Sequence, residues 1–278
     1  MRRGAERDPQ DDFPPRPLVC RSDADGVATL VLSRPRSRNA LSLEMIAALR
    51  SEIAALSTDT AVKAVVLSAE GPAFCAGHDL KELTAHRADP DGGREFYAHT
   101  MQQCSEMMQA IVASPKPFIA AVEGAATAAG CQLVATCDLA VASERAGFCT
   151  PGVNIGLFCS TPMVALSRNV SRKHAMEMLL LGDVMPAADA HRFGLVNRVV
   201  GAGEALGTAQ SLANQIASKS PVTVAIGKKA FYAQAEMPLH EAYDYAADVM
   251  TRNMMERDAE EGIGAFVDKR DPKWSEPS

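Results

Sequence analysis

The fold of this chain is decided by two short stretches: Phe-Cys-Ala-Gly-His-Asp-Leu at residues 74–80 and Val-Glu-Gly-Ala-Ala-Thr-Ala-Ala-Gly-Cys-Gln at residues 122–132. Each follows an apolar run that predicts a strand. Small residues after a strand let the backbone approach a ligand closely, and the second stretch opens a helix whose first N–H groups have no helical partner. One N–H from each turn can stabilise an oxygen that gains negative charge. For either stretch alone, close packing of the backbone is the favoured explanation.

Outward from these stretches the sequence alternates strands and helices, which predicts an α/β fold with a mostly parallel sheet. Strands are expected at residues 18–22, 27–33, 64–67, 118–122 and 139–142, and a helix capped by Ser42 is expected to end near residue 56. Beyond about residue 170 the pattern is almost entirely helical. We predict a disordered arm at 1–16, a core at 17–200 and a C-terminal helical region at 201–278.

Composition narrows the class of function. The 278 residues are 47% hydrophobic and carry a net charge of −6, which favours a packed core and argues against nucleic acid as a main partner. The longest uncharged run, residues 146–167, contains two prolines and three glycines, so no membrane span is expected. The seven cysteines form no CxxC pair, so the sequence predicts reduced thiols, no metal site and a cytoplasmic location.

Further motifs surround the two stretches in a fixed order. They are Arg34-Pro35, Arg38-Asn39-Ala40-Leu41, Phe-x-Ala-Gly-x-Asp-Leu, Pro117-x-Ile-Ala-x-Val-x-Gly, Gly-Cys-x-Leu, Cys137-Asp138-Leu-Ala, Gly194-Leu-Val and Phe266-Val-x-Lys-Arg. As a set, over roughly residues 18–270, they resemble the crotonase (enoyl-CoA hydratase/isomerase) superfamily.

The resemblance implies a spiral of ββα units, a C-terminal helical region used in trimerisation, and an acyl-CoA thioester as substrate. It implies a homotrimer or dimer of trimers and no separate cofactor, because coenzyme A is part of the substrate. The backbone N–H groups of His78 and Ala129 match the oxyanion hole. Positions that match coenzyme A contacts are Arg34, Arg38, Ala40, Ala76, His78, Asp79 and Leu80, with Phe266 and Lys269 reaching the nucleotide from a neighbouring subunit. A solvated helix charge is an equal alternative for Lys269, and a helix cap is the favoured alternative for Asp79.

The chain departs from the family at both catalytic carboxylates. The first glutamate of the hydratases belongs in Gly-x-Glu-Leu, where this chain has Gln132, and the second belongs in Pro-Glu-x-x-x-Gly, where it has Gly152. The amide of Gln132 can hold a water or a carbonyl but cannot accept a proton near neutral pH. Since general acid–base groups contribute about 10²–10⁴ in rate, we expect hydration of enoyl-CoA to be weak or absent.

Three functions therefore stay open. The first is an enzyme that acts through an enolate, with the His78 side chain as a candidate replacement for the missing groups. The second is a decarboxylase or other base-free lyase, because Ala-Gly-His-Asp resembles methylmalonyl-CoA decarboxylase. The third is an acyl-CoA-binding protein without turnover. The chain also resembles the family subgroup named enoyl-CoA hydratase domain-containing protein 3, which shares Gly-Cys-Gln-Leu and Thr-Pro-Gly-Val-Asn.

Overall fold

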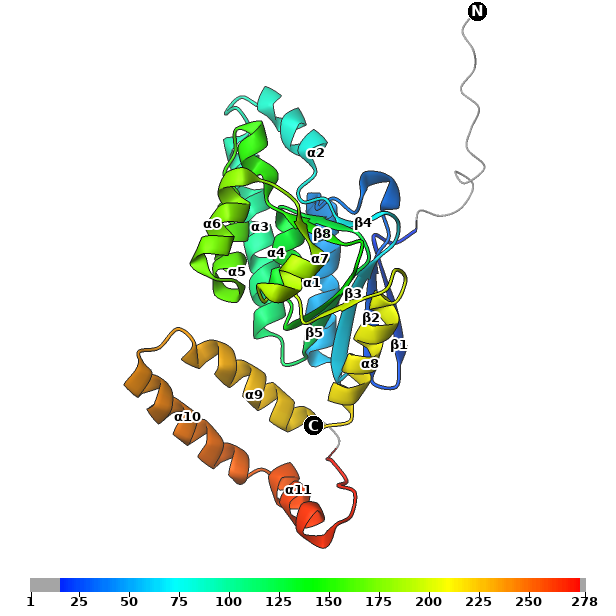
Figure 1. Ribbon diagram of the computed structural model, residues 1–278, viewed down its shortest axis with the longest axis vertical. Coiled ribbons are helices and arrows are strands. Elements are labelled where there is room, and N and C mark those ends of the chain that lie inside the picture. The colour runs from blue at the N-terminus through cyan, green and yellow to red at the C-terminus, as the bar shows by residue number, and fades with distance from the viewer. Residues whose placement is uncertain (1–15, 276–278) are drawn as a thin grey trace, which may run out of the picture.

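The strands of the chain divide between two sheets (Figure 1). A computed structural model describes residues 16–275, so the predicted N-terminal arm, apart from Arg16, lies outside the described residues. The larger sheet has the order β1-β2-β3-β5-β7-β10 and the smaller sheet the order β4-β6-β8-β9. The larger sheet contains β1 (Val19–Ala24), β2 (Val27–Leu32), β3 (Ala64–Ala69), β5 (Phe118–Val122), β7 (Leu139–Ser143) and β10 (Arg198–Val200). The smaller contains β4 (Ala73–Cys75), β6 (Ala125–Thr127), β8 (Gly147–Cys149) and β9 (Met185–Pro186).

The order of these strands shows a repeated unit. After the antiparallel hairpin β1–β2, three strands of the larger sheet are each followed along the chain by a strand of the smaller sheet and then by a helical segment. This happens for β3 and β4, for β5 and β6, and for β7 and β8. Strands β2, β3, β5 and β7 pair in parallel, as do β4, β6 and β8. The predicted α/β spiral of ββα units is therefore confirmed.

Helices cover both faces of the larger sheet. On one side, α1 (Leu43–Thr58) buries an apolar stripe at helical spacing, and the Ser42 hydroxyl accepts from the Met45 N–H and caps the helix. On the other side, α8 (Ala205–Ala217) lies against the sheet through four alanines, at positions 205, 209, 213 and 217. The remaining core helices are α2 (Leu80–Ala85), α3 (Arg94–Ala113), α4 (Ala129–Thr136), α5 (Pro162–Asn169), α6 (Arg172–Leu181) and α7 (Ala187–Arg192).

The last three helices, α9 (Pro221–Gln234), α10 (Leu239–Met254) and α11 (Arg257–Asp268), extend away from the core at the lower end of Figure 1. No residue of α10 is buried within this chain. Large apolar side chains stand exposed on these helices and in the turn between α10 and α11, among them Leu239, Tyr243, Met255, Phe266 and Val267. The division at residues 200/201 stays a prediction; α8, beyond it in sequence, packs on the sheet of the core.

The smaller sheet has no counterpart among the strands expected from the sequence. Its strands have only two or three residues, too short to show the alternation that identifies a strand. The uncharged run at 146–167 similarly contains β8, the short 3₁₀ helix η4 (Pro151–Ile155) and the start of α5, none of which the sequence predicted. Within residues 16–275, no helix is both long and apolar enough to cross a bilayer.

Candidate functional site

The site predicted from the sequence lies where three parallel strands of the smaller sheet end. Strand β6 pairs with β4 on one side and with β8 on the other. Carboxyl ends of neighbouring parallel strands meet at one edge of a sheet, so the segments that follow β4, β6 and β8 come together there. These segments carry His78, Ala129 and Gly152, which are separated by up to 74 positions in sequence.

Two glycines allow the first two segments to touch. A side chain on Gly130 would place its Cβ 2.1 Å from the carbonyl oxygen of Cys75, so α4 could not reach β4 with any other residue. Gly77 has φ +88°, and a Cβ there would lie 2.9 Å from the Thr127 oxygen and 3.4 Å from the Ala129 nitrogen. The peptide that precedes His78 therefore lies directly against the start of α4.

The amides of His78 and Ala129 have no protein acceptor within the described part of the chain. A short parallel bridge on either side of His78 uses other groups: the Leu41 N–H donates to the Gly77 carbonyl and the Asp79 N–H donates to the Leu41 carbonyl. Ala129 is the first residue of α4, where helical geometry supplies no acceptor. Two unpaired amides from touching turns, one of them at a helix N-terminus, form a site for an anionic oxygen.

The residue before the second amide has a strained backbone. Ala128 adopts φ 51° and ψ −115°, a region that favours glycine. Its N–H donates to the Cys149 carbonyl at 2.8 Å, which joins the start of α4 to the end of β8. The strain is thus held in place at the position that directs the Ala129 amide.

Three polar side chains near these amides have buried atoms that lack a partner in hydrogen-bond geometry in the described structure. They are both ring nitrogens of His78, the Oε1 of Gln132 and the Oγ1 of Thr150. Burial lowers the pKa of His78, an effect opposed by the Leu41 backbone, so the imidazole is neutral at pH 7. Unpaired buried polar atoms are rare in native proteins and require an explanation. Here they lie on the segments that follow β4, β6 and β8.

The position of the missing second carboxylate is occupied from elsewhere in the chain. A Cβ built on Gly152 would lie 2.9 Å from the sulfur of Cys159 and 3.0 Å from the Leu157 carbonyl oxygen. Residue 152 therefore has no room for a side chain while Cys159 is present. Sequence patterns missed this contact, because the six residues between the two positions form an irregular segment without periodicity.

The segment expected to contact coenzyme A borders the first turn. The Ala76 N–H donates to the Arg38 carbonyl at 3.0 Å, so the segment that contains Arg34, Arg38 and Ala40 is fixed beside residues 76–80. Both arginines are exposed, as is Leu80. Asp79 caps α2 by accepting from the N–H groups of residues 81 and 82, which is the structural role the sequence favoured. Whether any of these residues contacts coenzyme A stays a prediction.

Asn39 in this segment was quoted from the sequence without a role. It is completely buried with φ 53°, and its side chain accepts from the Arg34 N–H. The same side chain donates to the carbonyls of Glu70 and Ala73 at 2.9 Å each. Asn39 thus fixes the segment against the loop that enters β4. The short polar side chain, which tolerates the left-handed conformation, was the only local signal.

Phe266 and Lys269 are not brought to the site within one chain. They lie on α11 and at its C-terminal cap, at the opposite end of the molecule from α2 in Figure 1. Phe266 is 85% exposed. Their predicted role requires a second subunit.

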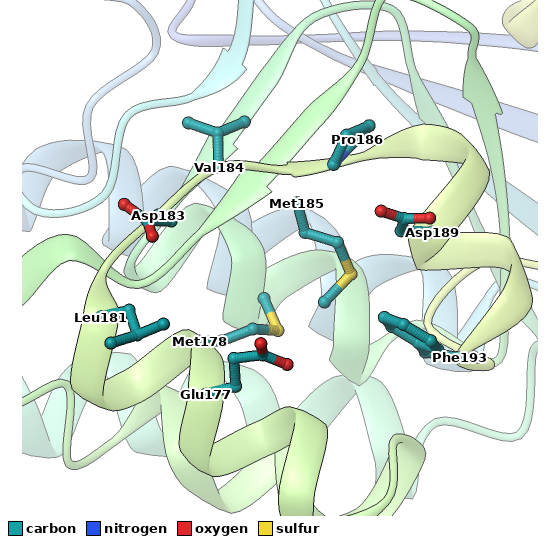
Figure 2. Close-up of a pocket in the computed structure, with 9 residues that line it drawn as sticks. All are labelled: Glu177, Met178, Leu181, Asp183, Val184, Met185, Pro186, Asp189 and Phe193. Atoms are coloured by element: carbon teal, nitrogen blue, oxygen red, sulfur yellow. The ribbon is translucent and has the colours of Figure 1, made fainter.

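Hollows elsewhere on the surface contain none of the predicted site residues. One, of about 220 Å³, lies between α6 and the segment 183–193 and has the carboxylates of Glu177, Asp183 and Asp189 around it (Figure 2). These negative groups would repel the phosphates of coenzyme A. The other, of about 500 Å³, lies among α9, α10, α11 and Trp274.

Comparison with known proteins agrees with the architecture. The family model described as enoyl-CoA hydratase/isomerase matches residues 22–277. The chain belongs to the enoyl-CoA hydratase/isomerase family. This family member is 47% identical over 272 residues to the mitochondrial enoyl-CoA hydratase domain-containing protein 3 of Rattus norvegicus, covering 98% of this chain and 89% of that protein.

Two solved structures of the family are similar over nearly their whole length. The crystal structure of human enoyl-CoA hydratase domain-containing protein 3 is 47% identical with a TM-score of 0.88, over 93% of this chain and 100% of that chain. That of an enoyl-CoA hydratase from Mycobacterium smegmatis is 50% identical with a TM-score of 0.89, over 93% and 99%. The resemblance to the crotonase superfamily, and to this subgroup of it, is confirmed.

Proposed function

We propose that this protein is an acyl-CoA enzyme that binds the thioester oxygen with the backbone amides of His78 and Ala129 and stabilises an enolate. The observation that carries the proposal is the pair of unpartnered amides on touching turns. Such donors contribute about 2.7–4 kcal/mol each to a transition state in which the oxygen becomes negative. The family of the chain supports an acyl-CoA as the ligand.

The same site argues against ordinary hydration. Hydration of an enoyl thioester requires a group that takes a proton from water and one that delivers a proton to the α-carbon. Gln132 is 5% exposed and its amide has no basic atom, while Gly152 has no side chain. We therefore place the enolate-stabilising step at the centre of the function and expect hydratase turnover to be weak.

Two measurements test this proposal. Calorimetric titration with butyryl-CoA is expected to show saturable binding. Loss of the enoyl absorbance of crotonyl-CoA is expected to be at least 10²-fold slower than with a family hydratase that has both glutamates. Turnover equal to that hydratase would contradict our interpretation of Gln132 and Gly152. If no acyl-CoA binds, the whole proposal is wrong.

Decarboxylation is the second candidate, and one observation favours it. The site combines an oxyanion hole with no carboxylate at positions 132 and 152, and departure of CO₂ creates the carbanion without a base. Incubation with malonyl-CoA and methylmalonyl-CoA, followed by mass spectrometry, should reveal acetyl-CoA or propionyl-CoA. Binding without any product would instead favour a protein that holds acyl-CoA without turnover.

Self-association is part of the proposal. The apolar side chains exposed on α9–α11 lack a covering element in one chain, which favours burial against other copies. A homotrimer or dimer of trimers would also allow Phe266 and Lys269 to reach a neighbour's nucleotide. Light scattering should give three or six times the 29.5 kDa chain mass, and a monomer would contradict this part.

We also propose a cytoplasmic location with reduced thiols. All seven cysteines are free, and six of them are buried. Relatives named enoyl-CoA hydratase domain-containing protein 3 carry the word mitochondrial in their names. The two compartments are distinguished by imaging the tagged protein in cells. Accumulation in mitochondria would contradict the proposed compartment.

A further inference from the structure

The position of residue 152 makes it important for any reaction at the oxyanion hole. Gly152 lies three residues beyond β8, and the last residue of β8, Cys149, accepts the Ala128 N–H at 2.8 Å. A side chain from this position would start beside the turn that supplies the second amide. In this chain the place of that side chain is filled by the Cys159 sulfur, which lies 2.9 Å from the Cβ position of residue 152.

The fold holds Cys159 firmly in this place. The chain leaves Gly152 through a 3₁₀ turn, and the Leu157 N–H donates back to the Gly152 carbonyl at 2.9 Å. The Cys159 carbonyl then accepts the Met163 N–H at 3.0 Å at the start of α5. These two bonds fix the backbone on both sides of Cys159, so its Cα is held beside Gly152.

Cys159 differs from the two thiols nearest to it. Cys131 on α4 is completely buried, and the Cys149 thiol donates to the Thr127 hydroxyl at 3.5 Å. Residue Cys159 is 9% exposed, and within the described residues its thiol donates no hydrogen bond, while the Gly152 backbone lies against its sulfur. Of the three, it is the thiol that remains available to a bound ligand.

Two unpaired polar atoms nearby independently indicate a ligand. Thr150, two residues before Gly152, is 0% exposed, and its Oγ1 has no partner in the region that the structure describes. Gln132, one helical turn after Ala129, is 5% exposed with an unpartnered Oε1. Burial of unpaired oxygens costs free energy that a polar ligand or ordered water would restore. The thiol therefore lies against Gly152, on the same segment after β8 as the unpaired Oγ1 of Thr150.

We propose that the Cys159 thiol, in the place of the absent second carboxylate, donates the proton to the α-carbon of the acyl-CoA enolate. This inference rests on the proposed function. In the step, the enolate π electrons form the new C–H bond with the thiol proton, the S–H bond breaks, and the thioester carbonyl forms again. The resulting thiolate recovers its proton from water. Nothing is oxidised or reduced.

The protonation state of the Cys159 thiol suits a proton donor better than a nucleophile. Burial raises the pKa of the Cys159 thiol, an effect partly opposed by the Gly152 backbone. The group thus stays protonated near neutral pH and can act as an acid, whereas nucleophilic cysteines have a lowered pKa. An enolate is far more basic than a thiolate, so proton transfer from the thiol is favourable.

The test is exchange of the α-hydrogens of butyryl-CoA in D₂O, followed by mass spectrometry, because the reverse of the proposed step removes the same hydrogen. At about pH 9, where a larger fraction of the thiol is ionised and can remove the hydrogen, we expect the wild-type protein to exchange and Cys159→Ala to exchange at least about 10²-fold more slowly, with calorimetric affinity for butyryl-CoA little changed. The matched control is Cys137→Ala, which removes a buried thiol at the other end of α4 and should exchange like wild type. Circular dichroism checks that each variant is folded.

Three results would overturn the inference while leaving the oxyanion hole intact. The first is exchange in Cys159→Ala at the wild-type rate. The second is tight binding without exchange in the wild-type protein. The third is exchange that survives Cys159→Ala but is lost in His78→Gln, which would transfer the role to the imidazole. Failure of butyryl-CoA to bind at all would overturn the proposed function itself.

Discussion

The two ends of helix α4 differ in whether their buried polar groups have hydrogen-bond partners. At its C-terminal end, Asp138 accepts from the Phe118 N–H at 2.7 Å, from Lys228 at 2.7 Å and from the Tyr232 hydroxyl at 2.9 Å. At its N-terminal end, the Ala129 amide and the Oε1 of Gln132 have no partner in the described structure. The polar groups at the C-terminal end have their hydrogen-bond partners within the chain. Those at the N-terminal end would find partners in a bound ligand.

The C-terminal end of α4 connects the core to the C-terminal helices. Besides Asp138, the Lys228 ammonium donates to the carbonyls of Ile111 and Lys116 at 2.9 Å each, so all three of its protons are used. Burial lowers the pKa of Lys228, and the Asp138 carboxylate opposes that change. Saturated hydrogen bonding indicates a structural anchor, whereas missing hydrogen bonds indicate a binding site.

The largest effect is expected when the anchor is broken. Lys228→Met leaves the mostly buried Asp138 carboxylate without its cation, which should lower the free energy of unfolding by about 3–5 kcal/mol. Urea denaturation measures the loss. Lys229→Met, on the adjacent exposed position, is the control and should change stability little. Equal effects of the two variants would show that Lys228 is no anchor.

At the N-terminal end of α4, substitution of Gly130 should reduce stability and ligand binding the most. Its Cβ would meet the Cys75 carbonyl oxygen at 2.1 Å, so Gly130→Ala must separate α4 from β4 and move the Ala129 amide. We expect a stability loss of about 1–3 kcal/mol and loss of butyryl-CoA binding. Gly207→Ala, at an exposed position of α8 with open space, should instead stabilise by up to about 1 kcal/mol. Unchanged binding in Gly130→Ala would contradict the role of this contact.

The contact between residues 152 and 159 predicts an energetic coupling. Gly152→Ala should destabilise, because the new methyl group meets the Cys159 sulfur at 2.9 Å, although the Leu157 carbonyl at 3.0 Å also resists it. With Cys159→Ala already present, the cost of Gly152→Ala should fall by about 1 kcal/mol. A double-mutant cycle by chemical denaturation measures this term, and strict additivity would show that the sulfur is not the obstacle.

The strained residue should respond in the opposite sense from an ordinary helical alanine. Ala128→Gly relieves the backbone strain at φ 51° and should stabilise by about 1 kcal/mol. Ala135→Gly, within regular α4, should destabilise by about 1 kcal/mol or more. Thermal unfolding compares the two. Loss of stability in both would mean that position 128 carries no strain.

The smallest effect concerns pH. The folded-state pKa of His78 is lowered by burial, so the unfolded chain binds its proton more readily. The contribution of the neutral imidazole to the free energy of unfolding is therefore fully present above the unfolded pKa of about 6.5. It declines as the pH falls below that value. Denaturation at pH 7.5 and 5.5 should show a decline that is smaller in His78→Gln. An equal decline in both would assign it to other groups.

The sequence predicted the local parts of both ends and missed what joins them. Strands at 118–122 and 139–142 have clear apolar runs, and the small-residue turns at Gly77 and Gly130 revealed the convergent amides. The bond from Lys228 to Asp138 spans 90 positions, so no local periodicity reveals it. The same is true of the approach of Cys159 to Gly152, which depends on an irregular loop. Local pattern predicts elements; contacts between distant segments need the fold.

The most direct measurement is a crystal structure of the protein with bound butyryl-CoA. We predict that the thioester oxygen lies about 2.7–3.1 Å from the backbone nitrogens of both His78 and Ala129. An oxygen that points away from these amides, with the amides bonded to water or to protein groups, would contradict the account.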